Sequence, residues 1–294
     1  MLYGRIMKAL SGFYYVETEA GLLRCRARGK FRAQSLIPLV GDRVSVEPTE
    51  PGCGYVTHIE PRRNCFVRPA VANVDALVLL CANVNPVTDP FLVDRVAVVA
   101  ESVNCGVVIC VNKCDLDRGD ALAAAFSNHT GYPVLCTSAE TGEGVEALRD
   151  LIRGKTVAFT GNSGVGKSSL LNRLAPGMDL EVGEVSQRLG RGRHTTRHTE
   201  LFSLGEDTWV IDSPGFSSFD AQEVDWELKC RLPETFPEFA PYLEGCRFAG
   251  CQHVKEKGCA VLQAVKDGAI PKQRHESYVR LWNELKDLKD WQQK

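Results

Sequence analysis

The pattern of apolar and polar residues divides the chain into three stretches. The first, residues 1–66, has short runs of β-forming residues that are interrupted by Gly and Pro. We expect strands at 13–16, 22–32, 43–46 and 55–59. Such closely spaced strands are typical of a small antiparallel barrel or sandwich.

In the second stretch, residues 67–224, apolar runs alternate with helix-like segments. This alternation indicates a parallel sheet that is covered by helices. Its strands are expected at 74–81, 107–111, 133–136, 156–160 and 208–211.

The third stretch, residues 225–294, has no strand pattern and contains a Cys- and His-rich segment before a polar helical tail. We therefore expect a multidomain α/β protein with a third, helical domain. In the tail, apolar residues at helical spacing predict a packing face. These residues are Tyr278, Leu281, Leu285 and Leu288.

The composition excludes several classes of protein. Hydrophobic residues make up 44% of the 294 residues, and the net charge is −2, as in ordinary soluble globular proteins. Residues 1–66 carry ten Lys or Arg against six Asp or Glu, whereas the remaining 228 residues carry 25 against 31. The twelve cysteines come without a secretory leader or an apolar run of about 18 residues. We therefore expect free thiols in a monomeric, cytoplasmic protein that has no membrane segment.

A phosphate-binding loop is predicted between the strand at 156–160 and a helix-like segment. Its glycines let backbone N–H groups surround the phosphates at the positive end of the helix. Its Lys would neutralise the β- and γ-phosphates, and its final Ser would bind Mg²⁺. A flexible glycine loop alone does not explain this Lys–Ser pair. The loop residues are Gly161, Asn162, Ser163, Gly164, Val165, Gly166, Lys167 and Ser168.

Two further motifs indicate that the bound base is guanine. The carboxylate of Asp115 can accept hydrogen bonds from guanine N1–H and the 2-amino group together, which adenine cannot offer. The amide of Ala139 is available to the base oxygen. A third motif, with Asp212 and Gly215, resembles the D-x-x-G that senses Mg²⁺ and the γ-phosphate. The two guanine motifs are Asn112, Lys113, Cys114 and Asp115, and Thr137, Ser138 and Ala139.

The order of these motifs is circularly permuted, because both guanine motifs precede the phosphate-binding loop. Ligands bind at the carboxyl ends of parallel strands whatever path joins the strands, so the site survives the permutation. We expect the segment 144–153 to be the helix that leads into the phosphate-binding strand.

The loop between the phosphate-binding loop and Asp212 is strongly basic. Either Thr195 or Thr196 is expected to be the switch residue that binds Mg²⁺, and we favour Thr196. Phe216 stands where Ras-like enzymes place a water-orienting Gln, so hydrolysis should be slow without a partner. His194 is a candidate catalytic residue, although a surface His is an equally good interpretation.

A metal site is predicted in the third stretch. Three thiolates and one imidazole within fourteen residues suit a structural, tetrahedral Zn²⁺. This segment has little apolar material with which to fold otherwise. The four residues are Cys246, Cys251, His253 and Cys259.

An alternating run of cations lies in the first stretch. If its strand continues through Gly29, five cations share one face with no acid nearby, which favours contact with an RNA backbone over a merely solvated face. Phe13, Tyr14 and Tyr15 could stack on bases, although core packing is expected for at least one. The cations are Arg24, Arg26, Arg28, Lys30 and Arg32.

The permuted order, the string G-R-H-T-T, the Cys/His segment and the basic front together resemble the ribosome small subunit-dependent GTPase family (YjeQ/RsgA) over essentially the whole chain. The resemblance implies an OB-fold barrel, a permuted GTPase core and a zinc domain. It implies that residues 112–115 and 161–169 bind GTP or GDP, and the second range includes Ser169. It also implies that the protein binds one zinc ion. The resemblance further implies the small ribosomal subunit and its rRNA as partners, and late maturation of that subunit. Because the permuted order runs the switch after Gly215 directly into the third stretch, we expect hydrolysis to release the protein.

Two alternatives remain open. One is a permuted GTPase that acts on the large subunit, against which the zinc segment and the basic barrel argue. The other is a binding module that uses GTP as a timer with negligible turnover. Stimulation of hydrolysis by purified subunits would separate them.

Overall fold

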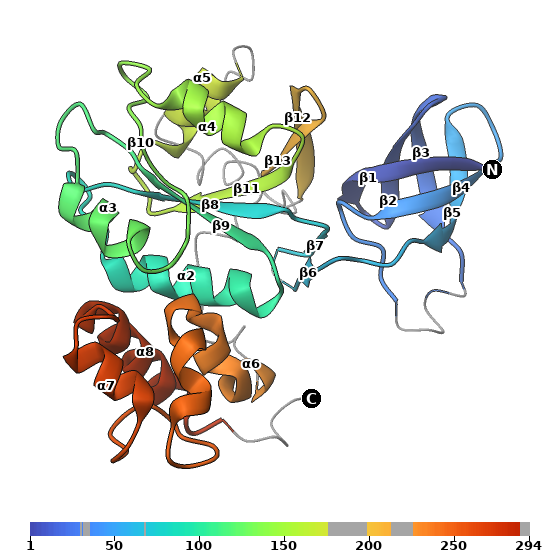
Figure 1. Cartoon of the computed structure of the whole chain (residues 1–294). Helices are drawn as coiled ribbons and strands as arrows, with labels where there is room; N and C mark the ends of the chain where they lie inside the picture. Colours follow the sequence, from blue (N-terminus) through green and yellow to red (C-terminus); the bar gives the residue numbers. More distant parts are fainter. Residues whose placement is uncertain (30, 32–35, 68, 176–198, 213–225, 289–294) are drawn as a thin grey trace.

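The computed structural model describes residues 1–29, 31, 36–67, 69–175, 199–212 and 226–288. It has an N-terminal β-barrel, a central sheet covered by helices, and a helical C-terminal part that packs beside helix α2 (Pro90–Ser102) (Figure 1). Among these residues no helix is both long and apolar enough to cross a membrane.

The N-terminal part is a closed barrel of five strands. The strands are β1 (Leu2–Leu10), β2 (Phe13–Thr18), β3 (Gly21–Ala27), β4 (Arg43–Pro48) and β5 (Cys53–Ile59). Strand β1 pairs with both β2 and β4, which closes the barrel. In β3, Leu23 and Cys25 are buried while Arg24 and Arg26 are exposed, because successive side chains of a strand point to opposite faces. The barrel predicted from the sequence is confirmed, although β1 was not predicted.

The prediction that the cationic strand continues through Gly29 is wrong. Strand β3 ends at Ala27, and the chain then turns, with the Phe31 amide donating to the Arg28 carbonyl at 3.1 Å. Only Arg24 and Arg26 therefore share the outer face of the strand.

The expectation of no acid nearby is also wrong, because Arg28 forms an ion pair with Glu47 of β4. The two residues are distant in sequence, and the barrel brings them together. Lys30 and Arg32 lie outside the described residues.

The central sheet has the order β10-β9-β8-β11-β13-β12, and all of its strand pairs except β13–β12 are parallel. Its strands are β8 (Ala76–Cys81), β9 (Gly106–Val111), β10 (Val134–Cys136), β11 (Thr156–Gly161), β12 (Glu200–Gly205) and β13 (Thr208–Asp212). Every residue of β8 is buried, as expected for a parallel strand covered on both faces. The predicted α/β core is confirmed, and β12 is an unpredicted addition.

Helices cover both faces of the central sheet (Figure 1). One face packs against α2 and α3 (Asp120–Ser127), and the other against α4 (Val145–Ile152) and α5 (Lys167–Leu174). Helix α4 leads directly into β11, as the permuted order predicts. A separate two-stranded ribbon, β6 (Cys65–Phe66) and β7 (Val71–Ala72), follows the barrel.

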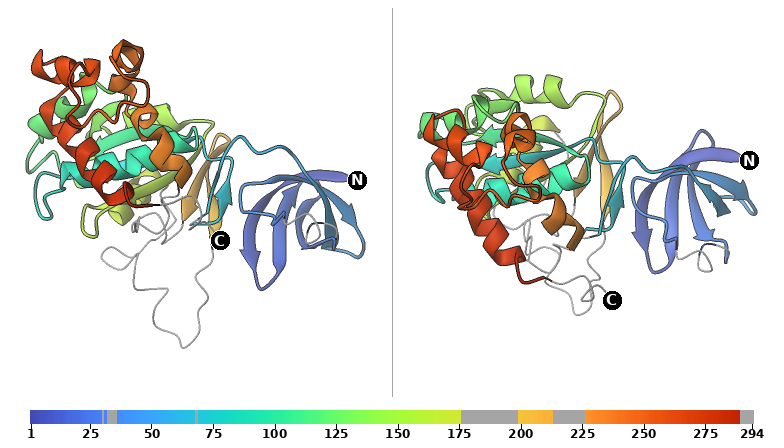
Figure 2. Two further views of the ribbon diagram at one scale, coloured as in Figure 1. Left: turned by 90° about the horizontal axis from the view of Figure 1, so that it is seen from below. Right: turned by 60° about the horizontal axis from the view of Figure 1, so that its bottom comes forward.

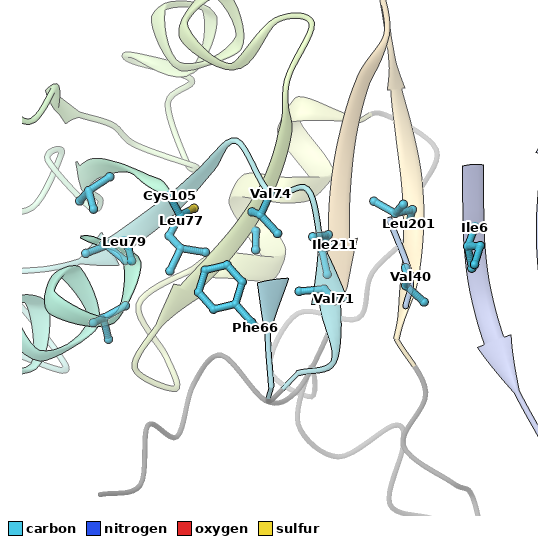
Figure 3. Packing of buried hydrophobic residues seen from close by; sticks show 14 of the residues in the cluster. Ile6, Val40, Phe66, Val71, Val74, Leu77, Leu79, Cys105, Leu201 and Ile211 are labelled. Carbon is cyan, nitrogen blue, oxygen red and sulfur yellow. The ribbon is translucent and has the colours of Figure 1, made fainter. Parts of the chain in front are cut away.

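The barrel and the central sheet are joined edge to edge. Strand β1 pairs with β12 at Lys8 and Glu200, and the side chains of these two residues form an ion pair of 2.7 Å. A second bridge joins Val40, which precedes β4, to Val71 of the β6–β7 ribbon. Figure 3 shows Val40, Val71 and Leu201 in the apolar cluster that extends from the barrel into the central sheet.

The C-terminal part consists of short helices on the side of the central part away from the barrel (Figure 2). They are α6 (Trp226–Arg231), the 3-10 helices η3 (Leu232–Thr235) and η4 (Pro237–Gly245), α7 (Ala260–Lys266) and α8 (Lys272–Leu285). The predicted packing face of the tail is confirmed: Tyr278, Leu281 and Leu285 are buried and Leu288 packs against them.

Charged side chains are buried where α8 meets the central part. Arg274 of α8, only 2% exposed, binds Asp94 of α2 and donates to both carboxylate oxygens of Glu238 in η4 at 2.5 and 3.0 Å. Burial lowers the pKa of Arg274, but Asp94 and Glu238 outweigh that effect and raise it overall. The C-terminal part is thus attached to α2 by an ion-paired interface as well as by apolar packing.

Candidate functional site

The phosphate-binding loop lies between β11 and α5, as predicted. Gly166 precedes α5 with a φ of 92°, and a Cβ there would lie 2.4 Å from the side-chain nitrogen of Asn112. Glycine is therefore required by both the backbone conformation and the close approach. Val165 and Ser168 are buried, while Ser163 and Gly164 are exposed at the tip of the loop. The tip of the loop is thus open to solvent, where a phosphate chain can reach it.

Asn112 connects the first guanine motif to the phosphate-binding loop. Its buried side-chain nitrogen donates to the carbonyl of Val165 at 2.8 Å. Its side-chain oxygen accepts from the Thr137 hydroxyl at 3.1 Å and from the Ala139 amide at 3.2 Å. One asparagine therefore holds three loops, from the ends of β9, β10 and β11, in fixed relative positions.

Asp115 lies at the exposed end of the same motif. The hydroxyl of Ser138 donates to one of its carboxylate oxygens at 2.5 Å, and the Thr141 amide donates to that hydroxyl at 3.0 Å. This arrangement aims a carboxylate into solvent beside the second guanine loop. The Ala139 amide, predicted to meet the base oxygen, donates to Asn112 in this structure.

Lys113 adopts a left-handed backbone conformation, with a φ of 66°. Its ammonium group donates to the carbonyl of Asn85 at 2.5 Å. The next residue, Pro86, lies over the phosphate-binding loop, since a Cβ on Gly164 would lie 3.3 Å from its ring. The segment before α2 therefore contacts both the guanine motif and the phosphate-binding loop.

The sequence analysis missed Arg173 of α5. Its guanidinium donates to the carbonyls of Ala139 and Glu140 at 2.8 and 2.5 Å, so the helix after the phosphate-binding loop holds the second guanine loop. No motif marks this residue. Its only signal in the sequence is its place on the helix that follows the phosphate-binding loop.

The residues predicted to act on the γ-phosphate are only partly described. Asp212 ends β13 and pairs in register with Glu200 of β12. Thr195, Thr196, His194, Gly215 and Phe216 lie outside the described residues.

The cysteines near the GTP motifs act as packing residues. Burial raises the pKa of the Cys110 thiol to about 12, and it also raises that of Cys114 within the guanine motif. Cys110 lies against the Thr137 hydroxyl at 3.1 Å. Thiols with raised pKa values are poor nucleophiles, and all twelve cysteines are free.

The four predicted zinc ligands come together in the C-terminal part. The ligand atoms of Cys246, Cys251, His253 and Cys259 lie within 4.8 Å of one another. Nδ1 of His253 is 3.5 Å from the sulfur of Cys246 and 3.4 Å from that of Cys259, and these two sulfurs are 3.9 Å apart.

These distances fit a tetrahedral zinc. Zn–S and Zn–N bonds of about 2.3 and 2.0 Å place two sulfurs about 3.8 Å apart and a sulfur about 3.5 Å from a nitrogen. Burial raises the pKa of Cys259 to about 12 and lowers that of His253. A cation at the centre would reverse the cost of burying thiolates, and three thiolates with one imidazole leave no open position for chemistry.

Helix α8 supports the ligand loop from outside. Nε2 of His275 donates to the carbonyl of His253 at 2.7 Å, and the Tyr278 hydroxyl donates to the carbonyl of Gln252 at 2.7 Å. The indole of Trp282 donates to the Gln252 side chain at 2.9 Å. Such contacts orient metal ligands before the metal binds.

Comparison with known proteins identifies the family of this chain. The family model described as RsgA GTPase matches residues 59–222, and that described as RsgA N-terminal domain matches residues 3–56. A relative from Caldanaerobacter subterraneus subsp. tengcongensis is 43% identical over 97% of this chain and 96% of its own length. One from Moorella thermoacetica is 43% identical over 96% of this chain and 97% of its own. Both relatives are named small ribosomal subunit biogenesis GTPase RsgA.

Two solved structures share the whole fold. YjeQ from Thermotoga maritima has a TM-score of 0.81 at 34% identity, covering 98% of this chain and 99% of that one. YloQ, described as a circularly permuted GTPase, has a TM-score of 0.79 at 36% identity, covering 98% of this chain and 96% of that one.

Proposed function

The chain belongs to the RsgA family of circularly permuted GTPases and is a GTP hydrolase, and we propose that it acts in assembly of the small ribosomal subunit. The observation that carries the proposal is the full-length match to relatives that bear this function in their names. The basic outer face of β3 gives an RNA contact a physical basis. In this proposal residues 1–66 bind rRNA, 67–224 hydrolyse GTP, and 225–294 form a zinc-stabilised domain.

The GTP site is proposed to work through the loops that Asn112 connects. Backbone amides of the loop tip and Lys167 hold the phosphates, and Asp115, which Ser138 orients, recognises guanine. Ser168 would hold the Mg²⁺ that accompanies GTP, and this ion would neutralise charge on the β- and γ-phosphates. Ser169, Asn162 and Cys114 are proposed to complete the binding loops.

Hydrolysis is attack of water on the γ-phosphorus, which yields GDP and phosphate. Because Phe216 cannot orient that water, we propose that binding of the small subunit brings Thr196 and His194 into place. Thr196 would then face Mg²⁺ and His194 the water. Loss of the γ-phosphate would weaken binding and release the protein.

The test is GTP turnover with and without purified subunits. We expect slow turnover alone, a large increase with small subunits, and no increase with large subunits. Equal stimulation by large subunits would contradict a specific role in assembly of the small subunit. Absence of stimulation by either would leave GTP hydrolysis without a ribosomal role.

A further inference from the structure

The barrel carries a hollow of about 680 Å³ that none of the GTP or zinc residues lines. It lies between the β1–β2 turn, the end of β3 and the segment before β4. Its walls include Phe13, Tyr14, Arg26, Phe31 and Ile37. Its volume falls in the range of pockets that bind small organic groups.

Phe13 differs from its neighbour Tyr14 in what its ring contacts. Tyr14 beside it packs against the barrel core, whereas Phe13 belongs to none of the apolar clusters of the described residues. Its ring is instead accompanied by two guanidinium groups, with the Cζ atoms of Arg24 and Arg26 at 5.1 and 4.7 Å from its centroid. Within the described part of the chain neither arginine forms an ion pair.

Part of the lining of the hollow is apolar and reaches solvent. Ile37 is 68% exposed there, and Phe13 is only half-buried. Water therefore contacts a flat ring, an aliphatic side chain and the Arg26 cation on one concave surface. Arg24 lies beside the Phe13 ring but does not line the hollow, and Arg28, which does line it, is paired with Glu47. This surface suits a ligand with both a flat apolar face and a negative charge.

We propose that this hollow binds a single unpaired nucleobase of single-stranded RNA, stacked on Phe13, with an adjacent phosphate on Arg26. Aromatic rings and guanidinium planes are the surfaces on which unstacked bases lie. A base within a duplex is already stacked between its neighbours and cannot enter. The proposal rests on the proposed function and specifies the kind of RNA that the barrel recognises.

An acidic protein segment fits less well. A carboxylate would bind the arginines but would leave Phe13 and Ile37 exposed to water. An RNA strand covers the cations and the apolar surface together, because every nucleotide carries both a π-face and a phosphate. A protein partner is therefore one of the outcomes that the experiment must separate.

The experiment measures binding of the full chain to a short single-stranded RNA that contains one 2-aminopurine, and to the same RNA in a duplex. Phe13→Leu keeps an apolar side chain but removes the ring, and it should weaken single-strand binding about 10-fold. Duplex binding should stay unchanged. Arg26→Gln should weaken single-strand binding and reduce its salt dependence.

Tyr3→Leu is the matched control, since Tyr3 is an exposed aromatic residue on β1 that does not line the hollow. Equal affinities of the Phe13 and Tyr3 variants would overturn the proposal. An equal loss of affinity for the single strand and the duplex would also overturn it. So would competition by poly-glutamate that depends on Phe13, because the hollow would then bind an acidic protein segment. The unmodified protein's GTP turnover with small subunits tests the proposed function separately.

Discussion

Arg274 of α8 and Asp94 of α2 form a buried ion pair that attaches the C-terminal part to the GTPase core. Glu238 of η4 completes the cluster. Removing one partner of a buried pair leaves an uncompensated charge, which typically costs about 3–5 kcal/mol. Arg274→Met should therefore lower the free energy of unfolding by about that amount, measured by urea unfolding followed by tryptophan fluorescence.

Lys272→Met is the control on the same helix. Lys272 pairs with Glu276, but both side chains are more than half exposed, so this change should stay within about 0.5 kcal/mol. If the two variants unfold alike, the buried cluster does not stabilise the interface.

Asp115→Asn should exchange guanine for xanthine specificity. The substituted amide keeps one acceptor, so it can no longer accept from N1–H and the 2-amino group of guanine together, but its NH₂ group can donate to the 2-oxo group of xanthine. Affinity for GTP should fall about 100-fold or more, with a gain for xanthosine triphosphate, as measured by calorimetric titration. Asp120→Asn, at an exposed position outside the motif, should leave both affinities unchanged. Unaltered GTP binding by the Asp115 variant would exclude this carboxylate from base recognition.

Cys259→Ser should remove zinc and loosen the C-terminal part. Metal analysis should give about one Zn²⁺ per chain before the change, as expected for a closed four-ligand site. Cys230→Ser changes an exposed cysteine of α6 and should keep the full metal content. Retention of zinc by the Cys259 variant would refute the four-ligand site.

Local patterns were sufficient to predict the motif strands, the GTP loops and the four zinc residues. Each motif is a short stretch at a strand end, and the parallel topology brings those ends together. The zinc ligands lie within fourteen residues of one another.

What the sequence did not show depends on contacts between distant residues. Lys8 and Glu200 are 192 positions apart, and Arg274 and Asp94 are 180 apart. Arg173 reaches Ala139 across 34 positions. The residue pattern within one segment cannot predict such pairs. The ion pair of Arg28 with Glu47 was missed for the same reason.

His194→Ala should reduce the stimulation of GTP turnover by small subunits without weakening GTP binding. A well-placed catalytic group can contribute about 100-fold in rate, so stimulated turnover should fall by up to that factor. His198→Ala is the control in the same basic loop and should retain stimulation. An equal loss in both variants would indicate that the charge of the loop matters, and not the chemistry of His194.

The last prediction concerns the joint between the barrel and the GTPase core. Lys8 of β1 pairs with Glu200 of β12, and Glu200 also lies opposite Asp212 of the D-x-x-G motif. Lys8→Glu would place two carboxylates opposite each other across the strands, which costs up to about 1 kcal/mol. We expect this change to lower the thermal midpoint and to reduce turnover with small subunits, because the barrel would no longer be held against β12.

The reversed pair provides the decisive comparison. Glu200→Lys should behave like Lys8→Glu, and the double variant should restore both the thermal midpoint and the stimulated turnover, since the opposite charges again face each other. A double-mutant cycle on stability should give a coupling energy of about 0.5–1 kcal/mol. Turnover without subunits should differ little between Lys8→Glu and the unmodified protein, because Lys8 lies on the barrel and not among the GTP loops. If the effects of the two single changes simply add, the ion pair does not hold the barrel, and the joint depends on the apolar cluster around Val40 and Leu201 alone.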